Sequence, residues 1–322
     1  SAQGFLALDE ATRTNLGLAP ARGENRAGTG TLLELLDTTR TPMGSRLLRE
    51  WLLRPLADLE GIRRRHDAVE ALTRERALLR DLRERLGGIR DLERLIARLN
   101  AGTGNARDLR ALGASLAAVP EIRQRLEGAL PDLLRETGAG LVPLPELVEL
   151  LARALVDEPP ATLRDGGMIR PGFNGELDAL RAAASEGRNW LAEYQAREQE
   201  RTGIKTLKVR YNKVFGYYIE VSRGQVGNVP ADYVRKQTVV GGERFVTPEL
   251  KAYEDKITGA QEKAQALEYE LFVQLRDAAV ARTAEIQATA AALAQLDVLA
   301  TLAERALTLR YTRPIMTAGD RI

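Results

Sequence analysis

The sequence predicts a mainly α-helical fold: an elongated helical bundle with two long antiparallel helices that carry a small inserted antiparallel β-sheet. Apolar residues recur every three or four positions over most of the 322 residues, which is the period of an amphipathic helix. Residues 203–250 instead alternate apolar and polar side chains, which is the period of a strand. Prolines and glycines separate these segments.

The first helical region runs from about residue 31 to residue 159. Its apolar residues follow the helical period, as in the stripe formed by Leu47, Leu48, Trp51 and Leu52. Start signals support the prediction. Thr41 is an N-cap residue followed by Pro42 at the first helical position, and Asp58 can cap the next helix.

Two longer helices are predicted on either side of residues 203–250. The first begins near Gly175 and, at about 1.5 Å per residue, runs roughly 40 Å to residue 201. The second begins at Pro248 behind an N-cap at Thr247. Each has an apolar seam of the kind that pairs two helices. The seams are Leu177, Leu180, Ala184, Leu191 and Tyr194 in the first helix, and Ile257, Ala264, Leu267, Leu271 and Leu275 in the second.

The segment between these helices is predicted to form a small antiparallel sheet of four strands. Residues 207–222 and 233–246 show the alternation of strands with one buried face. Asn212-Lys213 lies between the first two predicted strands and Gly241-Gly242 between the last two, and both pairs favour turns. The loop tips therefore carry small or polar residues that can approach a partner closely.

Basic charge is concentrated in this segment. Residues 201–251 contain ten lysines and arginines and four acidic residues, a net charge of +6, whereas the whole chain carries +2; the remainder therefore carries −4. Such a cluster beside exposed strand faces favours a polyanion partner, most simply a phosphate backbone. The alternative is a solvated sheet surface with a chance excess of lysine and arginine.

Several classes of function are disfavoured by composition. The absence of cysteine excludes disulfides, thiolate nucleophiles and cysteine-based metal sites. His66 has no second histidine to complete a metal cluster or a catalytic triad. The glycine-rich stretches at 28–31 and 102–105 lack the phosphate-loop spacing. We therefore expect no catalytic, cofactor or metal site. With no long apolar run and no signal peptide, we expect a soluble, cytoplasmic chain without membrane partners.

Three stretches of the sequence resemble the MutS family of DNA mismatch-recognition proteins. They are LDTTRTPMGSRLL at 36–48 with WLLRPL at 51–56, YNKVFGYYI at 211–219, and RKQT at 235–238 followed by ERF at 243–245. In that family the helical body is the core or lever domain, and the inserted sheet is the clamp that closes over the DNA backbone.

The resemblance implies a division into domains. Residues 1–18 would end a connector domain, 19–186 and 259–310 would form the two parts of the core or lever domain, and 187–258 the clamp, with its sheet at about 205–247. Residues 311–322 would begin a truncated ATPase domain.

The expected role is non-catalytic, non-specific binding of duplex DNA, coupled by the lever helices to the ATPase domain. The basic side chains would supply a positive electrostatic field that attracts DNA. Asn212 and the backbone of Gly241-Gly242 would form hydrogen bonds with phosphates. The candidate DNA-binding residues are Lys208, Arg210, Asn212, Lys213, Arg235, Lys236, Gly241, Gly242 and Arg244. Relatives often have Asn-Ala where this chain has Gly241-Gly242, so contact there is limited to the backbone.

Other family properties belong to the parent protein. The Walker motifs and the Phe-x-Glu mismatch motif are not found in this sequence. ATP and magnesium, homodimerisation and the downstream partner MutL are therefore expected of the full-length protein, which would be a DNA-dependent ATPase, and no cofactor is expected here. The alternatives are a protein-interaction scaffold that docks an acidic partner, and a recombination-associated MutS paralogue, although bacterial forms of that paralogue lack the clamp insertion.

Overall fold

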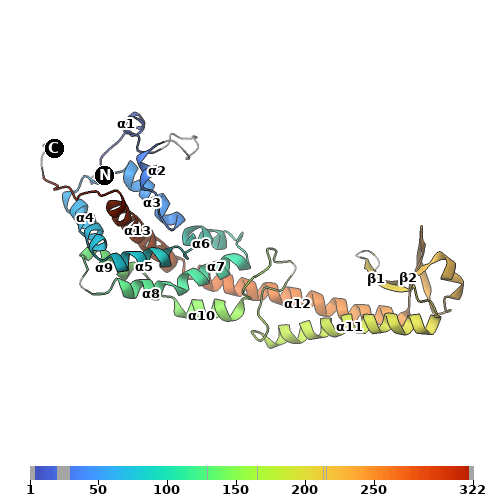
Figure 1. The fold of residues 1–322 in the computed structure, drawn as a ribbon. Helices are drawn as coiled ribbons and strands as arrows, with labels where there is room; N and C mark the ends of the chain where they lie inside the picture. Colours follow the sequence, from blue (N-terminus) through green and yellow to red (C-terminus); the bar gives the residue numbers. More distant parts are fainter. Residues whose placement is uncertain are drawn as a thin grey trace. The chain divides into compact units, whose positions relative to one another are not determined.

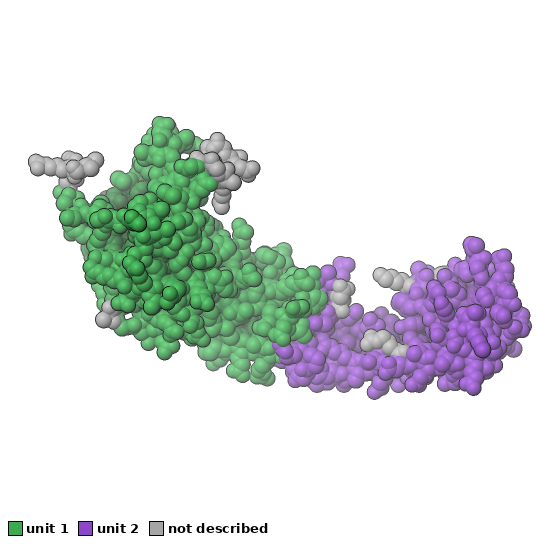
Figure 2. Space-filling model, viewed as in Figure 1, with its two compact units in different colours: residues 1–161, 274–322 green, residues 162–273 purple. Residues whose placement is uncertain are grey.

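The computed structural model describes residues 4–19, 30–128, 130–164, 166–212, 214 and 216–318. The described residues form two compact units (Figure 2), one from residues 1–161 and 274–322 and the other from residues 162–273. We call these unit 1 and unit 2. The finer domain boundaries expected from the family resemblance stay a prediction.

Unit 1 consists of helices packed around α13 (Thr283–Thr308), as Figure 1 shows. α13 contacts α2, α3, α4, α5, α6 and α9. The helices that precede it are α1 (Glu10–Asn15), α2 (Leu32–Leu36), α3 (Pro42–Leu53), α4 (Leu59–Arg74), α5 (Arg76–Leu86), α6 (Leu92–Asn100), α7 (Ala106–Ala117), α8 (Val119–Arg125), α9 (Asp132–Gly140) and α10 (Pro145–Ala154). α13 is long and apolar enough to cross a membrane, but 72% of its most apolar stretch is buried, as expected of a core helix.

A buried carboxylate in α13 holds the loop before α3. Asp297 accepts hydrogen bonds from the backbone N–H groups of Arg40 (3.0 Å) and Thr41 (2.7 Å) and from the Thr41 hydroxyl (2.7 Å). Burial raises the pKa of Asp297. Thr41 Oγ1 in turn accepts from the N–H of Gly44 at 2.9 Å, so the predicted N-cap of α3 is confirmed. The predicted cap at Asp58 is confirmed as well.

Unit 2 contains two long helices, α11 (Gly175–Thr202) and α12 (Pro248–Val280), which lie side by side (Figure 1). Their direction is antiparallel, because Arg181 pairs with Glu268 whereas Arg197, further along α11, pairs with Glu249. Several residues of the predicted seams are buried, namely Leu177 and Ala184 of α11 and Ile257, Ala264 and Leu271 of α12, whereas the buried Tyr194 packs in the core of the sheet. α12 continues beyond residue 273 into unit 1.

Within the described residues, the sheet has four antiparallel strands in the order β1-β2-β4-β3, with β1 and β3 at its edges. The strands are β1 (Lys208–Asn212), β2 (Gly216–Ser222), β3 (Val234–Val239) and β4 (Gly242–Val246), and the 3₁₀ helix η1 (Arg223–Asn228) follows β2. The predicted mainly helical fold with an inserted sheet is thus confirmed. Two residues predicted to lie in turns belong to strands instead, because Asn212 pairs with Gly216 in the β1–β2 ladder and Gly242 pairs with Val239 in the β3–β4 ladder.

Candidate nucleic-acid interface

The sheet is attached to α11 through a shared core and a buried polar cluster. Ile219, Val221 and Phe245 pack with Tyr194, and with Leu250 at the start of α12. The carboxylate of Glu198 on α11 accepts hydrogen bonds from Tyr233 Oη and Arg201 Nη2, both at 2.7 Å. The Tyr194 hydroxyl lies 2.5 Å from Thr247 Oγ1, and burial raises the pKa of Tyr194 to about 12. The sheet is therefore held in a defined orientation on the helices.

The strand register decides which side chains share a face. Ile219 and Val221 point into the core, so by alternation Tyr218 and Glu220 lie on the opposite face. Residues paired across strands share a face. Lys208, Glu220, Arg244 and Gln237, which are paired in turn across the sheet, therefore form a row on the face opposite the core. We call this the polar face.

Edge strand β1 places Lys208, Arg210 and Asn212 on the polar face. Lys208 is exposed, and its ammonium group forms no ion pair with a carboxylate among the residues that the structure describes, although its strand position lies opposite Glu220. The side chain of Arg210 is 51% exposed and its Nε lies 3.7 Å from Glu220. At about 3.4 Å per residue, alternate positions of the strand are about 7 Å apart. β1 thus presents a line of hydrogen-bond donors at nearly regular spacing.

Arg244 also lies on the polar face, but it is engaged within the sheet. Its guanidinium lies 4.5 Å from the ring centroid of Tyr218, donates to Gln237 Oε1 at 2.9 Å and is 3.5 Å from Glu220. Its side chain is only 22% exposed. Arg244 therefore covers Tyr218 and adds positive charge to the face, while less of its hydrogen-bonding capacity is open to a partner.

Arg235 and Lys236 are not part of this row. Arg235 is paired with Phe245, a core residue, so its strand position belongs to the opposite face, and its Nε lies 2.7 Å from Glu243. The register shifts between Arg235 and Gln237, which leaves Lys236 in a bulge with an exposed side chain. The candidate residues are thus divided between two faces of the sheet.

The two loop tips lie at opposite ends of β2. Asn212 ends β1, opposite Gly216 at the start of β2, and its Oδ1 accepts from the N–H of Val214 at 2.8 Å, which forms a local turn. Lys213 lies outside the described residues. At the far end, Gly241 is exposed, and its carbonyl accepts from the Arg223 N–H at 3.1 Å. Gly242 is buried: a Cβ there would lie 2.1 Å from the Val221 carbonyl oxygen. Sterics in the sheet therefore explain the glycine at 242.

Sequence reasoning missed the part that Glu220 takes in this face. In the charge count Glu220 only subtracts from the basic total, whereas in the structure it lies between Arg210 and Arg244 and approaches both. The contact between the Tyr218 ring and the Arg244 guanidinium was also missed, because the two residues lie on different strands and only the strand order brings them together. The alternation in β2 could indicate that Tyr218 and Glu220 share a face, but their partners follow only from the strand order.

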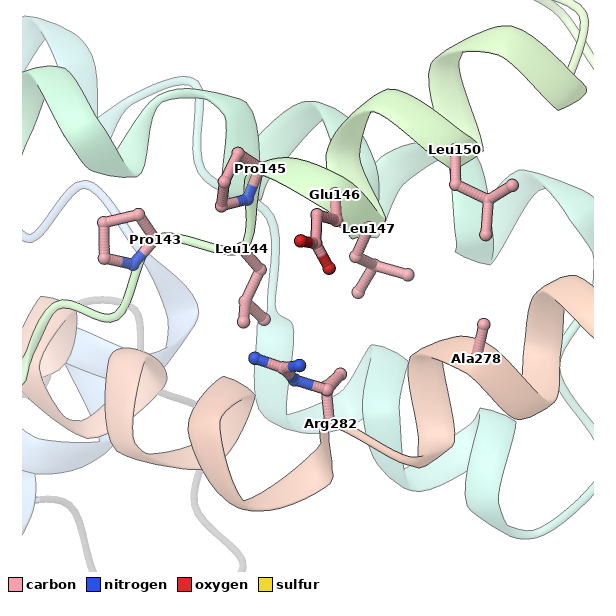
Figure 3. Close-up of a pocket in the computed structure, with 8 residues that line it drawn as sticks. All are labelled: Pro143, Leu144, Pro145, Glu146, Leu147, Leu150, Ala278 and Arg282. Carbon is pink, nitrogen blue, oxygen red and sulfur yellow. The ribbon is translucent and has the colours of Figure 1, made fainter.

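The structure also contains concave regions away from the sheet. One, of about 410 Å³, lies in unit 1 where α10 faces the junction between α12 and α13 (Figure 3). Its lining is mostly proline, leucine and alanine, and its charged residues are Glu146 and Arg282. Arg282 pairs with Glu285 at 3.0 Å. Among the described residues no group of three or more histidine, aspartate or glutamate side chains could hold a metal ion.

Comparison with known proteins identifies clear relatives. Residues 11–303 match the family MutS domain III. The DNA mismatch repair protein MutS of Halothermothrix orenii is 47% identical over 311 residues, covering 96% of this chain and 34% of the relative. The MutS of Chlorobaculum tepidum is 48% identical over 317 residues, covering 98% and 36%, and that of Methanosarcina barkeri is 47% identical over 322 residues, covering 99% and 36%. The chain spans about a third of the length of these curated relatives.

Proposed function

This chain belongs to the MutS family of DNA mismatch repair proteins, and we propose that its sheet is a non-catalytic clamp that binds the backbone of duplex DNA. Polar groups on edge strand β1 carry the proposal. Lys208, Arg210 and Asn212 share a face at intervals of about 7 Å, which is comparable to the separation of successive phosphates along a nucleic-acid strand. An exposed edge with this spacing can follow one strand of a duplex.

The expected contacts are independent of base sequence. Lysine, arginine and asparagine side chains that bind phosphates position a duplex but do not read its bases. In this proposal Lys213 and Lys236 add to the positive electrostatic field that attracts the duplex, and the backbone N–H of Gly241 donates to a phosphate. Arg244 contributes charge more than direct contact. Neutralising about four phosphates gives a slope of log K against log salt near −3.6, at roughly −0.9 per phosphate. Binding by this chain is therefore weak at high ionic strength.

The long helices are proposed to act as a lever. α11 and α12 are in close contact at Gly187 and Ile257, and Trp190 of α11 stacks on Tyr253 of α12 with ring centroids 3.6 Å apart. Helices packed in this way can transmit a displacement as a rigid pair. In the full-length protein we propose that ATP and magnesium, bound in an ATPase domain, move these helices and so open or close the clamp.

The remaining properties proposed for the full-length protein follow from the family alone. They are recognition of mismatched DNA during repair of damaged DNA, homodimerisation, association with MutL and a cytoplasmic location. A scaffold that docks an acidic protein is the alternative from another class, because the same basic face attracts any polyanion. A recombination-associated paralogue is the alternative within the family, although the inserted sheet argues against it.

Charge reversal on β1 tests the clamp. Binding of a short duplex at low salt is measured for the chain, for Lys208→Glu combined with Arg210→Glu, and for Lys256→Glu combined with Lys263→Glu. Lys256 and Lys263 are exposed lysines on α12 outside the sheet, and their reversal changes the net charge by the same amount, so this variant is the matched control. We expect the double variant to lose about tenfold or more in affinity and the control to bind nearly as the parent does. Equal affinity of all three proteins contradicts the clamp. An acidic protein that binds the chain specifically and is not displaced by duplex favours the scaffold.

A further inference from the structure

Four arginines line one concave region of unit 1, far along the sequence from the sheet. The region has a volume of about 600 Å³ and lies between α5, the loop before α3 and the C-terminal part of α13. Arg76, Arg80 and Arg83 occupy one side of α5 at helical spacing, and Arg40 comes from the loop. Leu79 and Leu307 supply an apolar part of its wall. We call this the arginine pocket.

Arg83 is buried without a carboxylate contact among the described residues. Its Nη1 donates to Thr301 Oγ1 at 3.2 Å and its Nη2 to the Thr38 carbonyl at 3.0 Å. Both partners are neutral. Burial, followed by the neighbouring charge of Arg40, lowers the pKa of Arg83, although the carboxylates of Glu304 and Asp297 act in the opposite sense. A buried cation with only neutral hydrogen-bond partners is costly, and a bound anion would relieve that cost.

The other three arginines are exposed and form no ion pair with a carboxylate of the described residues. Another arginine of α5 does form ion pairs: Arg85, on another side of the helix, pairs with both Asp81 and Glu121. Neither a packing role nor an ion pair therefore accounts for Arg76 and Arg80. Their charges converge on the arginine pocket without a carboxylate partner in the part of the chain that the structure describes.

The acidic residues of the pocket do not balance these charges. The lining contains Glu84 and Glu304 against four arginines, a net charge of +2. Glu304 accepts hydrogen bonds from the hydroxyls of Thr38 at 3.2 Å and Thr308 at 2.9 Å, and it lies 3.9 Å from Arg305, so its carboxylate is already engaged. The pocket therefore has an excess of positive charge, with three exposed arginines, Arg40, Arg76 and Arg80, beside the buried Arg83.

We propose that the arginine pocket binds a phosphate oxyanion through Arg40, Arg76, Arg80 and the inner Arg83. Arginine presents a planar fork of donors that matches phosphate oxygens, and a phosphate offers several oxygens to guanidinium groups that approach from different directions. A lone carboxylate accepts from fewer such groups. The source of the phosphate is either a small molecule such as a diphosphate or the backbone of DNA. This proposal does not depend on the clamp.

Calorimetric titration of the chain with inorganic pyrophosphate in low-salt chloride buffer tests the site. The variant combines Arg76→Gln with Arg80→Gln, both exposed residues whose side chains form no hydrogen bond or ion pair among the described residues, and Arg153→Gln on α10 is the control with the same change of charge per site. We expect the double variant to lose about tenfold or more in affinity, because two charge-assisted contacts disappear, while the control binds pyrophosphate as the parent does. Urea unfolding verifies that each variant is folded.

The proposal is overturned if the parent chain binds no pyrophosphate, or if the double variant binds it equally well. The source of the phosphate is resolved in a Lys208→Glu, Arg210→Glu background, in which the sheet is disabled. Displacement of pyrophosphate by a short duplex in that background identifies a DNA backbone as the ligand. Retention of pyrophosphate, together with binding of a nucleoside diphosphate, identifies a small phosphate. Because the clamp test uses residues of unit 2 and this test residues of unit 1, failure of one leaves the other intact.

Discussion

Gly187 of α11 faces Ile257 of α12 so closely that a methyl group at position 187 would lie 2.3 Å from Ile257 Cγ1. The absence of a side chain at this position lets the two helices approach each other in the middle of their seam. Further along α11, toward the end that carries the sheet, Trp190 stacks on Tyr253 of α12. Close packing without intervening space is what a pair of helices needs in order to move as one body.

Gly187→Ala is expected to destabilise the chain. Alanine favours a helix over glycine by about 1 kcal/mol, but the new methyl group overlaps Ile257, and overpacking of this kind costs about 1–3 kcal/mol. In an Ile257→Ala background the overlap is removed, so the same substitution should become stabilising. Urea unfolding followed by tryptophan fluorescence measures both effects. The same sign in both backgrounds would show that the two residues are not in contact.

Glu268→Gln is expected to release the loop that precedes α11. The Glu268 carboxylate is buried and accepts from the backbone N–H groups of residues 167–169 and from Arg181 Nη2 at 2.8 Å. An amide cannot accept at both ends, and it leaves Arg181 without its partner, so we expect a loss of about 3 kcal/mol or more. Glu262→Gln, an exposed position on α12, is the control. Equal unfolding midpoints for the two variants would contradict this assignment.

Much of the fold could be predicted from local sequence. Thr41 and Asp58 cap helices where their residue types indicate, and Thr247 followed by Pro248 starts α12 as expected. These features depend on neighbouring residues. The contact of Asp297 with Thr41 joins positions 256 residues apart, and no local pattern indicates it.

The candidate site was less predictable because it depends on strand order. Alternation alone places Lys208 and Arg210 on one face, but only the order β1-β2-β4-β3 brings Glu220 and Arg244 into the same row. The bulge after Arg235 changes which residues of β3 share that face. A bulge of this kind leaves no clear signal in the sequence.

Stability in acid should depend on Asp91. Hydrogen bonding to Arg46 (2.7 Å) is the main cause that holds the pKa of Asp91 below its usual range, and the backbone N–H of Arg94 adds to it. A lowered pKa in the folded state means that this stabilisation is present above about pH 4 and is lost as the pH falls through the folded value. Asp91→Asn should therefore be less stable than the parent at pH 7, and the difference should shrink in acid. A difference that is constant with pH would contradict the pairing.

Glu220→Gln is expected to strengthen duplex binding. The substitution removes a negative charge from the polar face and frees Arg210, so the gain should be about 0.5–1 kcal/mol at low salt. Glu243→Gln is the matched control, because Glu243 pairs with Arg235 away from that face. Fluorescence anisotropy with a labelled duplex measures both variants. Equal gains for the two would mean that total charge, rather than the polar face, governs binding.

The salt dependence of duplex binding tests the central claim most directly. The measurement compares the slope of log K against log salt for the chain with that for Lys208→Gln combined with Arg210→Gln. If β1 follows a phosphate backbone, the slope of the parent is near −3.6 and becomes shallower by about 1.8 in the double variant, since each lost phosphate contact removes roughly 0.9. An unchanged slope would show that the duplex does not bind at this strand.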